Sequence, residues 1–141
     1  MKTIKFRFVN KQKDNDKITF IYSSINDLEM EDSWQGKVNY ERLGINLFTG
    51  LQDKNGKDIY EGDIVKQTAK AYYDENHIDK TYIGEVVILA SKGTCLKRSK
   101  CKDNLTGSTY NVDYYVKVAQ YRSEVIGNIH ETETYYNEST T

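Results

Sequence analysis

Leu47-Phe-Thr-Gly-Leu-Gln-Asp-Lys-Asn-Gly-Lys-Asp-Ile-Tyr-Glu-Gly-Asp-Ile-Val65 is the stretch of the chain that decides the fold. Two apolar, strand-like pieces flank Asn55-Gly56, and an Asn-Gly pair supplies the positive φ that tight β-turns require. Gly62-Asp63 marks a second corner, where glycine permits a sharp bend and the aspartate side chain can accept hydrogen bonds from nearby backbone N–H groups. The stretch therefore predicts two β corners in succession.

Strand patterns continue on both sides of these corners. Apolar and charged residues alternate over residues 4–8, the period-two pattern of a strand with one buried face. A polar, turn-rich run at 11–17 separates it from the β-branched and aromatic run 18–22, so we expect a hairpin. Residues 82–89 form the most strand-like stretch of the chain, with Gly84 as an expected bulge.

The remaining segments carry weaker signals. Residues 110–118 alternate between apolar and polar side chains and predict a strand, and residues 124–129 predict the last one. Residues 67–80 lack regular periodicity and are interpreted as a long loop excursion. Residues 24–32 begin with a serine that could cap a short helix, although their composition also suits a loop.

Short strands with few helical patterns predict a mainly β fold, a small SH3-like β-barrel with long loop excursions and at most one short helix. The length of 141 residues fits a single domain spanning 1–141, with an inserted loop near 67–80 and a polar tail from about residue 130. Because only 38% of the residues are hydrophobic, the 12 tyrosines must help to fill a thin core.

Charge and hydropathy limit the classes of partner. The 20 basic and 21 acidic side chains nearly cancel, so nucleic acid would have to bind through a local basic patch. No apolar run approaches the roughly 18 residues of a membrane helix, and the alternating start of the chain does not read as a signal peptide. We therefore expect a cytoplasmic protein without a membrane partner.

A family resemblance rests on four stretches, which are Ile4–Arg7, Thr49–Val65, Gly84–Val87 and Glu124–Ile129. The chain resembles the YopX family of bacteriophage and prophage proteins, and the resemblance runs along its whole length. It implies a compact, mostly β protein with an SH3-type barrel, encoded by a phage or prophage and present in the bacterial host cell. It implies no reaction.

Four carboxylates in the central stretch raise the hypothesis of a metal-ion site. Asp53, Asp58, Glu61 and Asp63 could together hold Mg²⁺. The alternative is that Asp53 starts a turn, Asp63 closes a corner and the other two face solvent. Because no histidine, lysine or arginine stands at fixed spacing to complete a site, we favour the structural interpretation and expect no catalytic residue, metal or cofactor.

Two cysteines, Cys95 and Cys101, could bridge a loop by a disulfide if their geometry allowed it. In a reducing cytoplasm, free thiols are the favoured interpretation. Zinc would require further ligands, and the histidines His77 and His130 are distant in sequence.

The densest basic run of the chain lies at residues 92–102, interpreted as a loop close before Tyr110. Basic charge beside stacking aromatics is typical of sequence-neutral single-strand binders. The alternative, which we favour, is a solvated hairpin tip kept soluble by lysine. The candidate nucleic-acid contacts are Lys92, Lys97, Arg98, Lys100 and Lys102.

The tyrosines are the other candidate recognition residues, because tyrosine is enriched at protein interfaces. Tyr72, Tyr73, Tyr135 and Tyr136 lie in segments without strand alternation and are the best candidates for contact with a partner. The preferred hypothesis is a non-enzymatic phage accessory protein that acts through protein–protein contacts, self-association included. The alternative is a nucleic-acid-binding accessory module that uses the basic loop 92–102.

Overall fold

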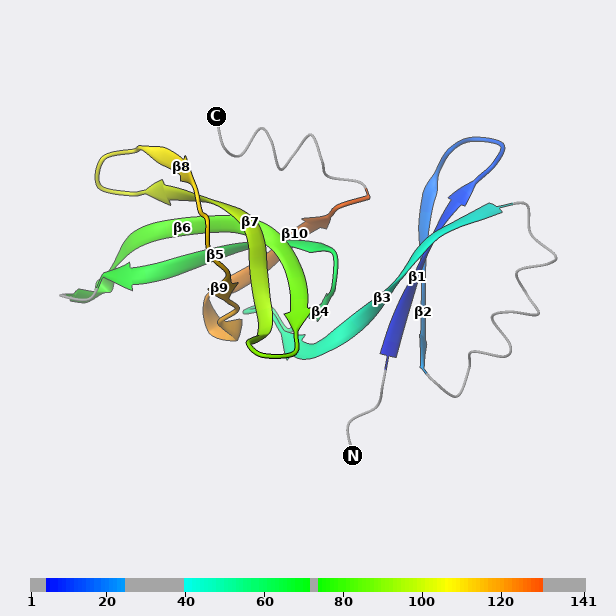
Figure 1. The fold of residues 1–141 in the computed structure, drawn as a ribbon, viewed down its shortest axis with the longest axis horizontal. Helices are drawn as coiled ribbons and strands as arrows, with labels where there is room; N and C mark the ends of the chain where they lie inside the picture. Colours follow the sequence, from blue (N-terminus) through cyan, green and yellow to red (C-terminus); the bar gives the residue numbers. More distant parts are fainter. Residues whose placement is uncertain (1–4, 25–39, 72–73, 131–141) are drawn as a thin grey trace.

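The computed structural model describes residues 5–24, 40–71 and 74–130, which form two antiparallel sheets (Figure 1). The first has the strand order β2-β1-β3-β4 and the second β10-β5-β6-β7-β8, with β9 also paired to β7. The elements are β1 (Lys5–Gln12), β2 (Ile18–Ser24), β3 (Tyr40–Gln52), β4 (Asp58–Tyr60), β5 (Asp63–Ala71), β6 (Asp74–Leu89), β7 (Gly93–Asp103), β8 (Thr109–Asn111), β9 (Val116–Lys117), the 3₁₀ turn η2 (Gln120–Arg122) and β10 (Ser123–Asn128).

The first sheet contains the predicted hairpin. β1 and β2 pair from Lys5 opposite Ser24 to Lys11 opposite Ile18, so the predicted opening strand and its hairpin are confirmed. The solvent-exposed face predicted for this strand is wrong, because Arg7 is as buried as its apolar neighbours. β1 also pairs with β3 on its other edge. As the inner strand of three, β1 is buried on both faces, and its residues Arg7 to Asn10 are all buried.

The second sheet corrects the interpretation of residues 67–80 as a loop excursion. Apart from residues 72–73, which lie outside the described part, this segment belongs to β5 and β6. The apolar alternation is missing because Gln67 occupies an inward position, only 4% exposed. Its side-chain amide donates to Lys117 O and accepts from Ala119 N–H, each at 2.9 Å, so a polar residue replaces the apolar one that the pattern requires.

Two further segments differ from their predicted form. Residues 93–102, expected in a basic loop, belong to strand β7. The single strand predicted over 110–118 is split into β8 and β9, which pair with separate parts of β7. Between them the backbone leaves the ladder, although Val112 and Val118 remain buried, which explains the apolar alternation.

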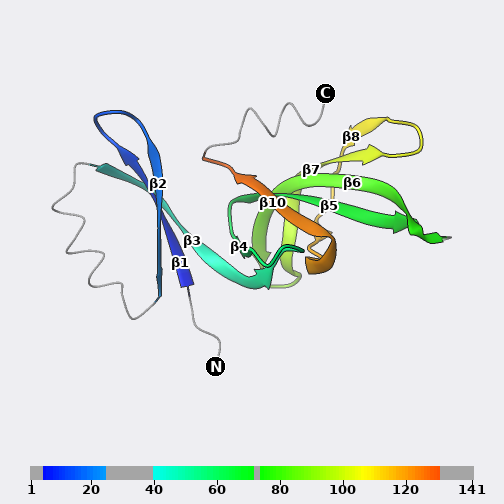
Figure 2. The same ribbon diagram turned by 180° about the vertical axis from the view of Figure 1, so that it is seen from behind.

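The two sheets do not form a closed barrel through the strand pairings of the described residues, in contrast to the predicted SH3-like barrel. Closure would require a ladder along the outer edge of β10. That edge instead meets the turn after β3, where Lys54 N–H donates to Ser123 O at 3.0 Å and Val125 N–H donates to an Asp53 carboxylate oxygen at 2.9 Å. Figure 2 shows β10 at the border of its sheet, next to β5.

The main core is thin and lies against the inner face of the second sheet. Ile59, Val65, Val86 and Leu96 are completely buried there, together with Tyr82. Gly84 lies at a register shift between β6 and β7, so the predicted bulge is confirmed. A Cβ at this position would lie 2.8 Å from the Ser99 Cβ, so the close approach of the two strands requires glycine.

Helical structure is minor in the described part of the chain. η2 is a single 3₁₀ turn. The short helix predicted over 24–32 lies almost entirely outside the described residues, as does most of the tail from residue 130. Within the ranges that the structure describes, no helix has the length and apolarity needed to cross a membrane.

Candidate functional site

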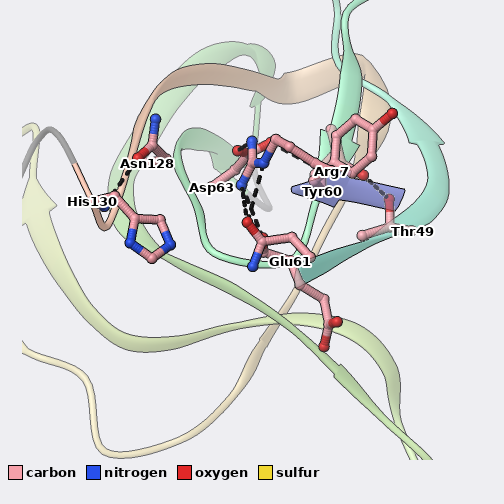
Figure 3. A network of polar contacts seen from close by, with 9 residues as sticks. Arg7, Thr49, Tyr60, Glu61, Asp63, Asn128 and His130 are labelled. Carbon is pink, nitrogen blue, oxygen red and sulfur yellow. Dashed lines mark hydrogen bonds and ion pairs between the residues drawn. The ribbon is translucent and has the colours of Figure 1, made fainter. Parts of the chain in front are cut away.

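Arg7 and Asp63 form a buried ion pair where the two sheets meet (Figure 3). Arg7 comes from β1 of the first sheet, and Asp63 begins β5 of the second. Their side chains are 5% and 2% exposed, and the Arg7 Nη1 donates to the Asp63 Oδ1. The pair therefore ties the first strand of the chain to the predicted Gly62-Asp63 corner.

The Arg7 guanidinium is satisfied on several sides. It donates to Asn46 Oδ1 from Nε at 3.1 Å and from Nη2 at 2.8 Å, and to the Glu61 backbone oxygen at 3.1 Å. The rings of Phe20 and Tyr60 lie about it, with centroids 5.2 and 5.1 Å from its Cζ. A cation enclosed in this way serves the packing of the corner.

Asp63 closes the corner as the sequence predicts. Its Oδ2 accepts the Tyr60 backbone N–H at 2.9 Å, and Gly62 has a φ of 85°. Burial raises the pKa of the Asp63 carboxyl above its usual range, although the Arg7 charge and the Tyr60 N–H both favour the ionised form. The desolvated carboxylate depends on these two partners.

Asp53 organises the other predicted corner. Its Oδ1 accepts the backbone N–H groups of Asn55 and Lys57 at 2.9 and 3.0 Å, and its Oδ2 accepts that of Val125. Burial opposes ionisation, but these three donors and the nearby Lys57 charge outweigh it and hold the pKa of Asp53 below its usual range. Gly56 has a φ of 82°, so the Asn55-Gly56 turn is confirmed.

The four central carboxylates thus have structural partners. Asp58 accepts from Lys5 Nζ at 3.4 Å and from Gln52 Nε2 at 3.1 Å, and a Glu61 carboxylate oxygen accepts the Leu47 N–H at 3.3 Å. No group of three or more His, Cys, Asp or Glu residues that could hold a metal ion occurs within residues 5–24, 40–71 and 74–130. The roles of Asp53 and Asp63 are those of the structural interpretation.

A cleft of about 950 Å³ opens beside the Arg7–Asp63 pair. Its volume falls within the roughly 300–1,000 Å³ of ligand pockets. β1 and β2 contribute Lys5, Arg7, Phe20 and Tyr22, and β10 lines it with Val125–Asn128. Lys5 is paired with Asp58 and Arg7 with Asp63, so the lining of the cleft does not favour a ligand of either charge.

The five basic candidates do not form one loop. Lys92 lies in the turn before β7, with its Nζ 5.6 Å from the Tyr115 ring centroid. Lys97 and Arg98 both bind the Glu85 carboxylate, at 3.5 and 2.7 Å. Lys100 and Lys102 lie two positions apart on β7 and point to the same side of the sheet.

The pairing of β5, β6 and β7 adds a lysine that the sequence analysis missed. Lys66 pairs with Ile83, which pairs with Lys100. Lys66 and Lys100 are far apart in sequence, so no local pattern links them. The position of Lys66 directly after Val65 along β5 was the available signal that Lys66 faces away from the core, because successive side chains of a strand point to opposite faces.

The tyrosines selected from the sequence cannot be placed. Tyr72, Tyr73, Tyr135 and Tyr136 all lie outside the described residues. Four other tyrosines are conspicuously exposed on the segment from β8 to η2, where the exposed fractions are 44% for Tyr110, 55% for Tyr114, 46% for Tyr115 and 70% for Tyr121. Sequence alternation suggested burial for some of them, because it did not show that this segment follows the edge of a sheet.

Both cysteines are free thiols and both are buried, Cys95 at 2% and Cys101 at 1% exposure. Cys101 lies between Tyr82 of β6 and Tyr110 of β8 in the strand register. Burial, followed by a hydrogen bond with Tyr114, raises the pKa of Tyr82. Cys101 thus belongs to the buried cluster on the inner face of the second sheet, whereas Cys95, next to Leu96 in β7, is buried outside that cluster.

These features define a mainly β protein of two antiparallel sheets, whose central carboxylates and arginine hold its own corners together. Comparison with protein-family models gives the family. The model of the YopX family, described as YopX protein, matches residues 2–134, so the chain belongs to the YopX family. No curated protein matches the chain.

Proposed function

We propose that this YopX family protein is a non-enzymatic phage or prophage accessory protein that binds another protein in the cytoplasm of the bacterial host. The observation that carries the proposal is the exposure of four tyrosines between Tyr110 and Tyr121. Tyrosine contributes a large, rigid contact area and a hydrogen-bonding hydroxyl, and it is enriched among the residues that dominate binding energy. We call Tyr110, Tyr114, Tyr115 and Tyr121 the tyrosine surface.

The absence of a catalytic role is part of the same proposal. It is supported by the use of Asp53, Asp63 and Arg7 in buried structural contacts, which leaves them unsuited to proton transfer with a substrate. We also propose that the fold of this protein is related to the SH3-like barrels. This proposal is supported by the Gly62-Asp63 corner that leads into β5.

The test compares tyrosines on two parts of the molecule. Tyr115→Ser/Tyr121→Ser removes rings from the tyrosine surface, whereas Tyr22→Ser removes a ring that is 59% exposed and lines the cleft. Tagged wild type and variants are recovered from phage-infected or prophage-carrying cells, and light scattering measures self-association. We expect the double variant to lose the partner or the oligomer and Tyr22→Ser to keep it.

Two outcomes would contradict the proposal. A wild-type protein that is strictly monomeric and recovers no partner would remove the protein-binding role. Loss of the partner with Tyr22→Ser and its retention by the double variant would move the binding site to the cleft.

A further inference from the structure

One side of the second sheet combines lysines from two strands with hydroxyl and amide side chains. Strand register arranges these residues in two transverse rows across β5, β6, β7 and β8. We call this surface the lysine face, and its members are Lys66, Ile83, Lys100 and Asn111 in one row and Thr68, Thr81, Lys102 and Thr109 in the next.

The lysine face is the solvent side of the sheet. The intervening row contains Gln67, Tyr82 and Cys101, which are 4%, 8% and 1% exposed. Successive residues of a strand point to opposite faces, so the two rows of the lysine face point away from the core. None of their eight residues is buried.

The lysines are close enough to act on one ligand. Lys100 and Lys102 are separated by two residues along β7, about 7 Å, and Lys66 lies two strands away from Lys100, about 10 Å. Two carboxylates adjoin the lysine face: Glu85 binds Lys97 and Arg98, and Glu124, the register partner of Lys66 in the pairing of β10 with β5, lies 3.5 Å from Lys54 Nζ. These two carboxylates are outnumbered by the basic side chains around them, on a chain whose net charge is −1: Lys54, Lys66, Lys97, Arg98, Lys100 and Lys102.

We propose that the lysine face binds the phosphate backbone of a nucleic acid without sequence preference. Lysine, threonine and asparagine are among the side chains that contact phosphate oxygens in such complexes. The eight residues include no aromatic ring for base stacking, so duplex and single strand are both accepted. An anionic membrane fits less well, because Ile83 is the one aliphatic side chain among the eight.

This site goes beyond the proposed protein-binding function and uses a different surface. Tyr110 is the register partner of Cys101, which places it on the side of the sheet opposite the lysine face. A nucleic acid on the lysine face would leave Tyr110 accessible to a protein. The two proposals can therefore fail independently.

The test measures the binding of the purified protein to labelled nucleic acid by fluorescence anisotropy over a range of salt concentrations. The probes are a duplex and a single strand, each about 30 nucleotides long, and phosphatidylserine vesicles serve as a second polyanion. The variant Lys66→Gln/Lys100→Gln/Lys102→Gln should bind about tenfold more weakly at low salt. Its log–log salt dependence should be shallower by about one per lysine removed.

Matched controls separate the lysine face from net charge and from the linear basic run. Lys11→Gln/Lys13→Gln/Lys17→Gln removes the same charge from the β1–β2 hairpin and should leave affinity within about twofold of wild type. Lys66→Gln alone should weaken binding more than Lys92→Gln, because Lys92 belongs to the linear run but lies in the turn before β7. Folding is checked by the thermal midpoint of each variant.

Three results would overturn the inference. The first is a wild-type protein that binds neither probe at low salt. The second is an equal loss of affinity in the hairpin variant, or a larger loss with Lys92→Gln than with Lys66→Gln. The third is binding confined to the vesicles, which would assign the lysine face to a membrane surface.

Discussion

The Val125 backbone N–H donates to Asp53 Oδ2 at 2.9 Å, across 72 positions of the sequence. This bond fixes the outer edge of β10 to the turn that follows β3. The same carboxylate orders that turn through its other oxygen. One buried side chain thus connects a local corner to the last described strand.

Replacing Asp53 by Asn should loosen this connection. The amide group would present a donor to the Val125 N–H in one orientation and to the Asn55 and Lys57 N–H groups in the other. We expect the free energy of unfolding in urea to fall by about 1.5–3 kcal/mol. Asp58→Asn is the control, because its ion pair with Lys5 is partly exposed and should contribute less than about 1 kcal/mol.

The pH dependence of stability should carry the Asp53 signature. Because the pKa of Asp53 is lower in the folded than in the unfolded protein, its ionised form adds to stability at neutral pH. That contribution is fully present above the unfolded pKa of about 3.9 and is lost as the pH falls through the folded value. Thermal midpoints between about pH 2 and 7 should fall less steeply in Asp53→Asn than in wild type; parallel profiles would contradict this role.

The buried Arg7–Asp63 pair gives a double-mutant cycle. Arg7→Met should lower the free energy of unfolding by about 3–5 kcal/mol, because it leaves the Asp63 carboxylate buried without its cation. Arg7→Met/Asp63→Asn should recover part of this loss, since the neutral amide can still accept the Tyr60 N–H. Additive losses in urea denaturation would show that the two side chains are not coupled.

Gly84 should tolerate no side chain. An alanine Cβ would lie 2.8 Å from the Ser99 Cβ and 3.0 Å from the Leu96 Cβ, so Gly84→Ala should cost about 1–3 kcal/mol. Gly44→Ala is the matched control, because no atom lies within 4 Å of its added Cβ and its φ is not positive. Equal midpoints of thermal unfolding for the two variants would rule out the close strand contact.

The two thiols should be protected in the folded protein. Cys95 and Cys101 are free and nearly inaccessible, so a thiol reagent such as DTNB should react slowly with the native protein. Two equivalents of thionitrobenzoate per chain should be released only after denaturation. Rapid reaction in the native state would contradict the burial, and the absence of thiols after denaturation would indicate a disulfide.

Local chemistry made part of this fold predictable from sequence. The corners at Asn55-Gly56 and Gly62-Asp63 were predictable because a positive φ and a side-chain hydrogen-bond acceptor depend only on residues close in sequence. The partner of Asp63 was not predictable, because Arg7 lies 56 positions away and is brought to the corner only by the pairing of β1 with β3. The shared row of Lys66 and Lys100 was not predictable either, because only the register of β5, β6 and β7 brings these two residues together.

Hydrophobic alternation did not predict the strands in which a buried position is occupied by a hydrogen-bonded polar side chain. Gln67 replaces an apolar side chain at an inward position, so the hairpin of β5 and β6 resembled a loop in the sequence. The residues from 110 to 118 alternate well, yet they pair with β7 only at their two ends. Alternation reports which side of a strand is buried, but it does not report how many hydrogen-bonded partners the strand has.

β3 pairs with β1 along its first part and with β4 at Phe48 and Gln52, and Figure 1 shows it passing from one partner to the other. Because side chains alternate along a strand, one residue inserted between Leu47 and Phe48 would turn the later side chains of β3 to the opposite face, unless the irregular pairing after Phe48 took it up as a further bulge. One continuous strand therefore sets the register of the pairing with β1 and of the pairing with β4. An insertion at this point would therefore disturb the pairing with β4 while leaving the pairing with β1 in place.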